Sequence, residues 1–153
     1  MNVNFTRKIE GIMSISKFNN EGYYDPTAYA GLSAVEKEER AAKAFRPIVY
    51  ICSPYAGNIE ANTANARRYC RFAIDTGYIP IAPHLLFPQF LNDNEKLERI
   101  LGMHCGNALM SKCSEVWVFG SVISNGMAQE IERAKRKGYT LRFFSDEINE
   151  VTD

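Results

Sequence analysis

The chain has 153 residues, 46% of them hydrophobic, and a formal net charge of zero, which suits one compact domain. A neutral chain offers no net field to attract nucleic acid or an anionic membrane. The sequence has no apolar run of about 18 residues to span a bilayer, and its N-terminal stretch lacks the apolar core of a signal peptide. We therefore expect a cytoplasmic protein with neither nucleic-acid nor membrane partners.

The cysteines form no C-x-x-C pair, and each of them lies within an apolar stretch: Cys52, Cys70, Cys105 and Cys113. Free cysteine behaves as a small buried hydrophobic residue. We therefore expect reduced side chains in the core rather than a disulfide framework.

Residues 1–46 differ in composition from the rest and are predicted to form a polar extension with one helix. Asp25 is a typical N-cap residue, and Pro26 is favoured at the first helical position. A helix of roughly 18 residues is predicted to follow. Its apolar stripe is narrow, and residues 36–40 are all charged. Two interpretations remain open, a solvated helix packed by one edge on the domain or an arm that contacts a second copy of the chain.

Residues 47–153 are predicted to form the main domain, in which short apolar runs alternate with helical patterns. The runs typical of strands are 48–52, 78–83, 115–120 and 140–144, and the helical patterns cover 59–77 and 95–113, with 84–96 as a loop. Residues 121–138 are predicted to form a glycine-bearing turn and then a helix that ends at Gly138. Trp117, in the third run, is predicted to be a core residue. This alternation predicts an α/β fold with a doubly wound, flavodoxin- or Rossmann-like parallel sheet, in a single domain with an N-terminal helical extension.

Ligands of such sheets bind beyond the C-terminal ends of the strands, which selects the loops 53–58, 84–89 and 120–130. The first loop lacks the Gly-x-Gly-x-x-Gly and Gly-Lys-Ser/Thr motifs, so no NAD, ATP or other cofactor is predicted. Ser53 and Gly57, with the amides of the next helix, can hold a hydroxyl group or one phosphate. An ordinary turn between a strand and a helix would show the same residues.

The predicted substrate-binding residues of these loops are Ser53, Pro54, Tyr55, Gly57, His84, Phe87, Gly120, Ser124, Gly126 and Met127. The aromatic rings of Phe87 and Phe90, which follow the second strand, can stack on a nucleobase. His84 and His104 lie on different elements and lack acidic or cysteine neighbours at ligand spacing, so no metal site is predicted.

The residues Ser124, Asn125 and Gly126 predict a turn that opens a helix, and Glu130 follows close to its first turn. A carboxylate at that place faces the ligand crevice. Acidic residues are also common near helix N-termini because of the helix dipole alone, so Glu130 by itself does not decide the chemistry.

The segments VYICSPY and SNGMAQE resemble the nucleoside 2-deoxyribosyltransferase superfamily, which includes 2'-deoxynucleoside 5'-monophosphate N-glycosidases, over residues 47–144. The resemblance implies that Glu130 is the nucleophile and that Tyr50 is the tyrosine of the first strand. Ser53, Gly57 and Ser124 match positions that bind a 5'-phosphate in the monophosphate-hydrolysing branch. The chain departs from the family pattern at two positions, with Ala128 in place of a glycine and Asn107 in place of an aspartate.

The resemblance implies cleavage or exchange of the N-glycosidic bond of a nucleoside or its monophosphate through a covalent glycosyl-enzyme. Asn107 can orient a leaving base but cannot serve as a general acid. Tyr50 can donate a hydrogen bond to Glu130 if its ring lies beside the carboxylate, and is otherwise a half-buried strand residue.

Several alternatives remain open at this point. The reaction can be transfer or hydrolysis, and the substrate a nucleoside or a nucleotide. With Asn107 in place of the family's aspartate, the chain can also be a non-catalytic module that binds or senses nucleotides. Because sites of this superfamily are often completed by a neighbouring subunit, the resemblance also implies a homo-oligomer, a dimer or larger.

Overall fold

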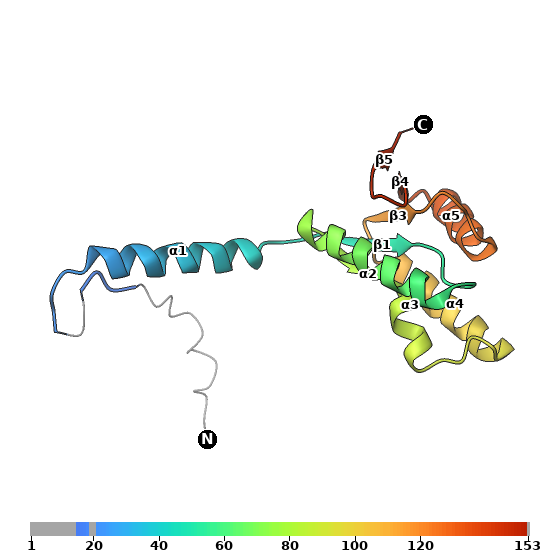
Figure 1. The fold of residues 1–153 in the computed structure, drawn as a ribbon, viewed down its shortest axis with the longest axis horizontal. Helices are drawn as coiled ribbons and strands as arrows, with labels where there is room; N and C mark the ends of the chain where they lie inside the picture. Colours follow the sequence, from blue (N-terminus) through green and yellow to red (C-terminus); the bar gives the residue numbers. More distant parts are fainter. Residues whose placement is uncertain (1–14, 19–20, 153) are drawn as a thin grey trace, which may run out of the picture. The chain divides into compact units, whose positions relative to one another are not determined.

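The structure is a computed structural model that describes residues 15–18 and 21–152. Residues 1–14, which include most of the stretch used for the signal-peptide prediction, lie outside this part. Within the described residues, no helix has the length and apolar character needed to cross a membrane. The chain divides into two compact units, residues 1–45 and residues 46–153, and Figure 1 shows the elements of each.

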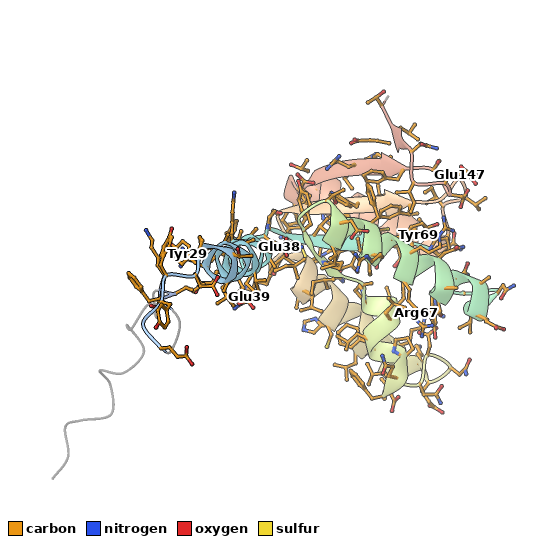
Figure 2. The ribbon with its side chains drawn as sticks, turned by 60° about the vertical axis from the view of Figure 1, so that its left-hand side comes forward. Tyr29, Glu38, Glu39, Arg67, Tyr69 and Glu147 are labelled. Carbon is orange, nitrogen blue, oxygen red and sulfur yellow. The ribbon has the colours of Figure 1, made fainter. Side chains whose placement is uncertain are left out.

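The first unit contains helix α1, Pro26–Ala42. Asp25 caps the helix, since its carboxylate accepts the Ala28 N–H at 2.9 Å. The predicted start of the helix is therefore confirmed. No residue of α1 is buried, and Glu38 and Glu39, labelled in Figure 2, belong to its charged stretch.

The second unit is built on a five-stranded sheet in the order β2-β1-β3-β4-β5. Its strands are β1 Ile48–Cys52, β2 Ile79–Ile81, β3 Glu115–Phe119, β4 Thr140–Phe144 and β5 Glu150–Val151. The first four strands are parallel, which confirms the predicted α/β fold, whereas β5 runs antiparallel to β4. The sequence analysis missed β5 because two residues are too few to show an alternating pattern.

The helices of this unit are α2 Ile59–Asp75, α3 Pro83–Leu86, the 3-10 helix η1 Phe87–Gln89, α4 Lys96–Met110 and α5 Asn125–Lys137. The prediction of a loop over 84–96 was wrong for its first half, where α3 and η1 lie. Pro83 and Pro88 each occupy the beginning of one of these helices. Proline favours that position because its fixed φ suits a helix and its missing N–H would have no helical partner there.

Alternate residues of the central strands face two separate cores. Tyr50, Cys52, Val116 and Val118 pack with residues of α4 and α5 on one face of the sheet. The residues between them, Val49, Ile51, Trp117 and Phe119, pack with α2 on the other face. Trp117 is 1% exposed, so its prediction as a core residue is confirmed. Tyr69, labelled on α2 in Figure 2, belongs to this second core.

The prediction for the cysteines is confirmed only in part. Cys52 is buried, whereas Cys70, Cys105 and Cys113 are partly exposed, and all four are free thiols. Cys70 and Cys105 lie on helices and Cys113 lies in the turn between α4 and β3, so none of the three is on a central strand and each is partly exposed.

The two-residue strand β5 is held to β4 by a fork of hydrogen bonds. Arg142 donates from Nε and Nη2 to the two carboxylate oxygens of Glu150, at 2.7 and 2.8 Å. The hydrogen bond to Glu150 raises the pKa of the Arg142 guanidinium, which lies 4.9 Å from the centre of the Trp117 ring. Charge-assisted hydrogen bonds thus help to hold β5 against β4.

Candidate functional site

A cavity of about 840 Å³ lies against the face of the sheet that carries Tyr50. Its walls come from β1, the loop that follows β1, α3 and η1, α4 and α5. Most of the predicted site residues line it: Tyr50, Tyr55, His84, Phe87, Asn107, Ser124, Gly126, Met127 and Glu130. The structure therefore brings side chains from all three predicted loops, and Asn107 of α4, to one hollow.

Tyr50 and Glu130 meet within this cavity although 80 positions separate them in the chain. The Tyr50 hydroxyl donates a hydrogen bond of 2.7 Å to Oε1 of Glu130. Oε2 of the same carboxylate is buried and has no hydrogen-bond partner among the described residues. The carboxylate is thus held by a hydrogen bond at Oε1, and Oε2 accepts none from the described residues.

Two local features of the sequence position this pair. Ser124 caps α5 by accepting the Met127 N–H at 3.3 Å, which starts the helix that carries Glu130. On α4, a Cβ atom at Gly106 would lie 3.4 Å from the Tyr50 hydroxyl and 3.6 Å from Pro83. These distances show that the α4 backbone passes close to the tyrosine hydroxyl.

Two groups beside Glu130, the Tyr50 hydroxyl and the Cys52 thiol, have raised pKa values. Burial, followed by the negative charge of Glu130, raises the pKa of the Tyr50 hydroxyl far above its usual range. The same two causes raise the pKa of the Cys52 thiol, two residues along β1 on the same face. Both groups therefore keep their protons at neutral pH beside the carboxylate.

Aromatic rings form another part of the wall. Tyr55, from the loop after β1, stacks on His84 of α3, with ring centres 5.1 Å apart and planes inclined by 10°. Phe87 lines the same cavity. Phe90, an expected stacking residue, is 64% exposed and borders a smaller adjoining hollow. The segments that follow β1 and β2 thus contribute a stacked pair of rings to the cavity wall.

Four predicted substrate-binding residues do not line the cavity in the described structure: Ser53, Pro54, Gly57 and Gly120. Ser53 is 2% exposed, so its hydroxyl is enclosed. Gly120 has a φ of +104°, and a Cβ there would lie 3.4 Å from Asp146 and 3.8 Å from Pro54. The loops after β1, β3 and β4 therefore pack closely at this glycine. The binding role of the four residues stays a prediction.

Sequence reasoning missed several charged residues of the cavity wall: Asp93, Glu98, Arg99, Glu132, Arg133 and Arg136. Three of them follow Glu130 on α5 at spacings of two, three and six residues, and the spacing of three is the helical signal that could have found Arg133. The described residues contain no group of three His, Cys, Asp or Glu side chains arranged to hold a metal ion.

Residues 47–144 match a family described as a domain of unknown function, DUF7768. The chain belongs to the DUF7768 family. The matched segment of this DUF7768 protein contains every residue that lines the main cavity. No curated protein matches the chain.

The DUF7768 chain is also similar to a solved structure, a 2-deoxyribosyltransferase from the psychrotolerant bacterium Bacillus psychrosaccharolyticus. The TM-score is 0.53 at 16% sequence identity, and the match covers 69% of this chain and 77% of the other. At this identity the likeness shows the fold alone, and that fold is the α/β architecture predicted from the sequence.

Proposed function

We propose that this DUF7768 protein cleaves the N-glycosidic bond of a nucleoside or nucleotide, with Glu130 as the nucleophile. The observation that carries the proposal is the state of the Glu130 carboxylate, held by Tyr50 at 2.7 Å through Oε1 and buried without a partner at Oε2. A buried polar atom without a partner is destabilising by about 1–3 kcal/mol. A function in the cavity that Glu130 lines is a reason for such an atom to be retained.

The chemistry follows from the electron demand of the sugar. As the bond between C1' and the base nitrogen breaks, its electron pair leaves with the base and positive charge develops on the sugar ring. A carboxylate oxygen of Glu130 forms a bond to C1' and gives a glycosyl ester. Water, or a second base in a transfer reaction, then attacks C1' and releases the carboxylate. Tyr50 keeps the carboxylate oriented by its hydrogen bond to Oε1.

The leaving base must gain a proton or a strong hydrogen bond. Asn107 lines the cavity and its amide can donate a hydrogen bond to the base, but it has no acidic proton to transfer. The proton then comes from water or from another group of the cavity. For this reason a second candidate function stands beside the first, a nucleotide-binding or sensing module without turnover.

The test combines a substrate panel with two variants. Purified protein is incubated with deoxynucleosides and their 5'-monophosphates, with and without a second free base, and released base is measured by chromatography. We expect Glu130→Gln to lower the rate of release by roughly 10³-fold or more while ligand binding persists, because the nucleophile acts chiefly in the transition state. Glu132→Gln is the matched control, since Glu132 lines the same cavity on the same helix.

Each outcome has a distinct meaning. If Glu130→Gln releases base at the wild-type rate, the glycosyl-enzyme mechanism is wrong. If the wild-type protein binds nucleotides but releases no base from any substrate, the sensing module is the correct interpretation. New nucleosides formed only when a second base is present would identify transfer, and release of free sugar would identify hydrolysis.

A further inference from the structure

Three arginines line the cavity beside the proposed nucleophile: Arg99 on α4, and Arg133 and Arg136 on α5. None of these guanidinium groups makes an ion pair or hydrogen bond with another described residue. Most arginines elsewhere in the described part of the same unit do have partners, as Arg71 pairs with Asp75 at 2.6 Å and Arg142 with Glu150 at 2.7 Å. Arg67 on α2 is the exception among them. The unpaired guanidinium groups are therefore concentrated on the wall of the cavity.

Their placement along α5 is ordered relative to Glu130. Arg133 and Arg136 follow Glu130 by three and six residues on one helix. At a rise of 1.5 Å per residue their backbones lie about 4.5 and 9 Å further along the helix axis. Arg133 is partly buried and Arg136 is exposed. The wall thus passes, over about two helical turns, from the carboxylate to two cationic groups.

The wall is of mixed charge, because Asp93, Glu98 and Glu132 also line it. Glu98 already accepts the backbone N–H of Asn92, so this carboxylate helps to hold the loop before α4. The guanidinium groups stay unpaired in the presence of these acids. A planar guanidinium group with its donors free matches the paired oxygens of a phosphate, which it binds through two parallel hydrogen bonds.

We propose that the substrate is a nucleotide whose phosphate is bound by Arg133 and Arg136, with Arg99 contributing from the wall formed by α4. This inference rests on the proposed function and deepens it. Two positions expected to hold a phosphate, Ser53 and Gly57, are not among the described residues that line the cavity. The hydroxyl of Ser124 already accepts a backbone N–H of α5.

The scale of a nucleotide agrees with this placement. A 5'-phosphate is separated from C1' by the width of the sugar ring, on the order of 5 Å, which is about one helical turn. With C1' at Glu130 and the sugar lying along α5, a phosphate at this distance reaches the next turn of the helix, where Arg133 lies. Arg136, one turn beyond, meets the outer oxygens of the same phosphate.

The experiment measures binding apart from turnover. In the Glu130→Gln background, the dissociation constants of a deoxynucleoside and of its 5'-monophosphate are measured by calorimetry, with Arg133→Gln or Arg136→Gln added. We expect each arginine variant to raise the dissociation constant of the monophosphate by roughly 10-fold or more and to leave that of the nucleoside unchanged. Lys135→Gln is the matched control, because Lys135 is a basic residue of the same helix that does not line the cavity. Thermal melting checks that every variant folds.

The outcomes separate the phosphate site from the catalytic proposal. Monophosphate bound through the arginines without any release of base by the wild-type protein supports the phosphate site and overturns the proposed function. Release of base from nucleosides, with no effect of phosphate or of the arginine variants, supports the function and overturns the phosphate site. The site is also overturned if both ligands lose affinity equally, if Lys135→Gln has the same effect as the arginine variants, or if no nucleotide binds.

Discussion

Replacing Tyr50 with phenylalanine tests whether the tyrosine hydroxyl holds the Glu130 carboxylate. The change keeps the aromatic ring, which is 1% exposed, and removes only the donor of the 2.7 Å hydrogen bond to Oε1. Because Oε2 already lacks a partner, the variant removes the 2.7 Å hydrogen bond of the carboxylate and leaves only the neighbouring Cys52 thiol to interact with it. Both the stability of the fold and the orientation of the carboxylate should suffer.

The magnitude follows from the kind of bond that is lost. A hydrogen bond to a charged group contributes about 1.5–3 kcal/mol to the free energy of unfolding. In a domain of roughly 100 residues, 1 kcal/mol shifts the melting temperature by about 4–8 °C. The expected fall in melting temperature is therefore roughly 6–24 °C. A carboxylate that rotates freely should also lower kcat by about 10-fold or more with little change in KM.

Calorimetric melting and base release are measured side by side on Tyr50→Phe and on Tyr69→Phe. Tyr69 is equally buried, at 1% exposure, and its ring stacks on that of Phe119 with the ring centres 4.1 Å apart. Its hydroxyl has no hydrogen bond to another described residue. The control should therefore melt close to the wild type and keep its activity. A Tyr50→Phe protein that matches the wild type in both measurements would refute the assigned role of this hydrogen bond.

Two further predictions concern the leaving base and alkaline pH. Asn107→Asp should raise the rate of base release, measured by the same chromatography, because a carboxylic acid on the cavity wall can protonate the leaving base; an unchanged or lower rate would show that protonation does not limit the reaction. Burial raises the pKa of the Cys70 and Cys113 thiols from 9.0 to about 11, so between these values the folded state keeps protons that the unfolded state loses. The free energy of unfolding should therefore be highest below pH 9 and fall as the pH rises to 11, as measured by urea unfolding, and a flat or rising profile over this range would contradict the assignment.

The sequence predicted those parts of the fold that depend on local patterns. The strand ranges 48–52 and 140–144 agree with β1 and β4, because strands of a parallel sheet between helical layers are short apolar runs. Gly138 was predicted to end a helix, and it caps α5 with a left-handed φ of +73°. Elements of two to four residues, such as β5 and α3, are too short to produce a periodic signal.

The site was predictable only where a motif carried it. Glu130 was found from the turn that precedes it, and its role and that of Tyr50 came from the resemblance of their segments to a known superfamily. Their hydrogen bond depends on packing between residues 80 positions apart. Arg133 and Arg136 look like ordinary charges of a solvated helix in the sequence. Only the packing of α5 against the sheet shows that they line the cavity.

The two outer strands of the sheet determine how copies of this chain can associate. At one edge, β2 has three residues with Pro80 at its centre, which has no N–H to offer a further strand. At the other edge, β5 has only two residues, so it offers little backbone for pairing. Neither edge is a good template for sheet extension, which protects the protein against edge-to-edge aggregation. If the chain forms oligomers, its subunits should therefore meet through helices and loops, and the sheet of each subunit should remain separate.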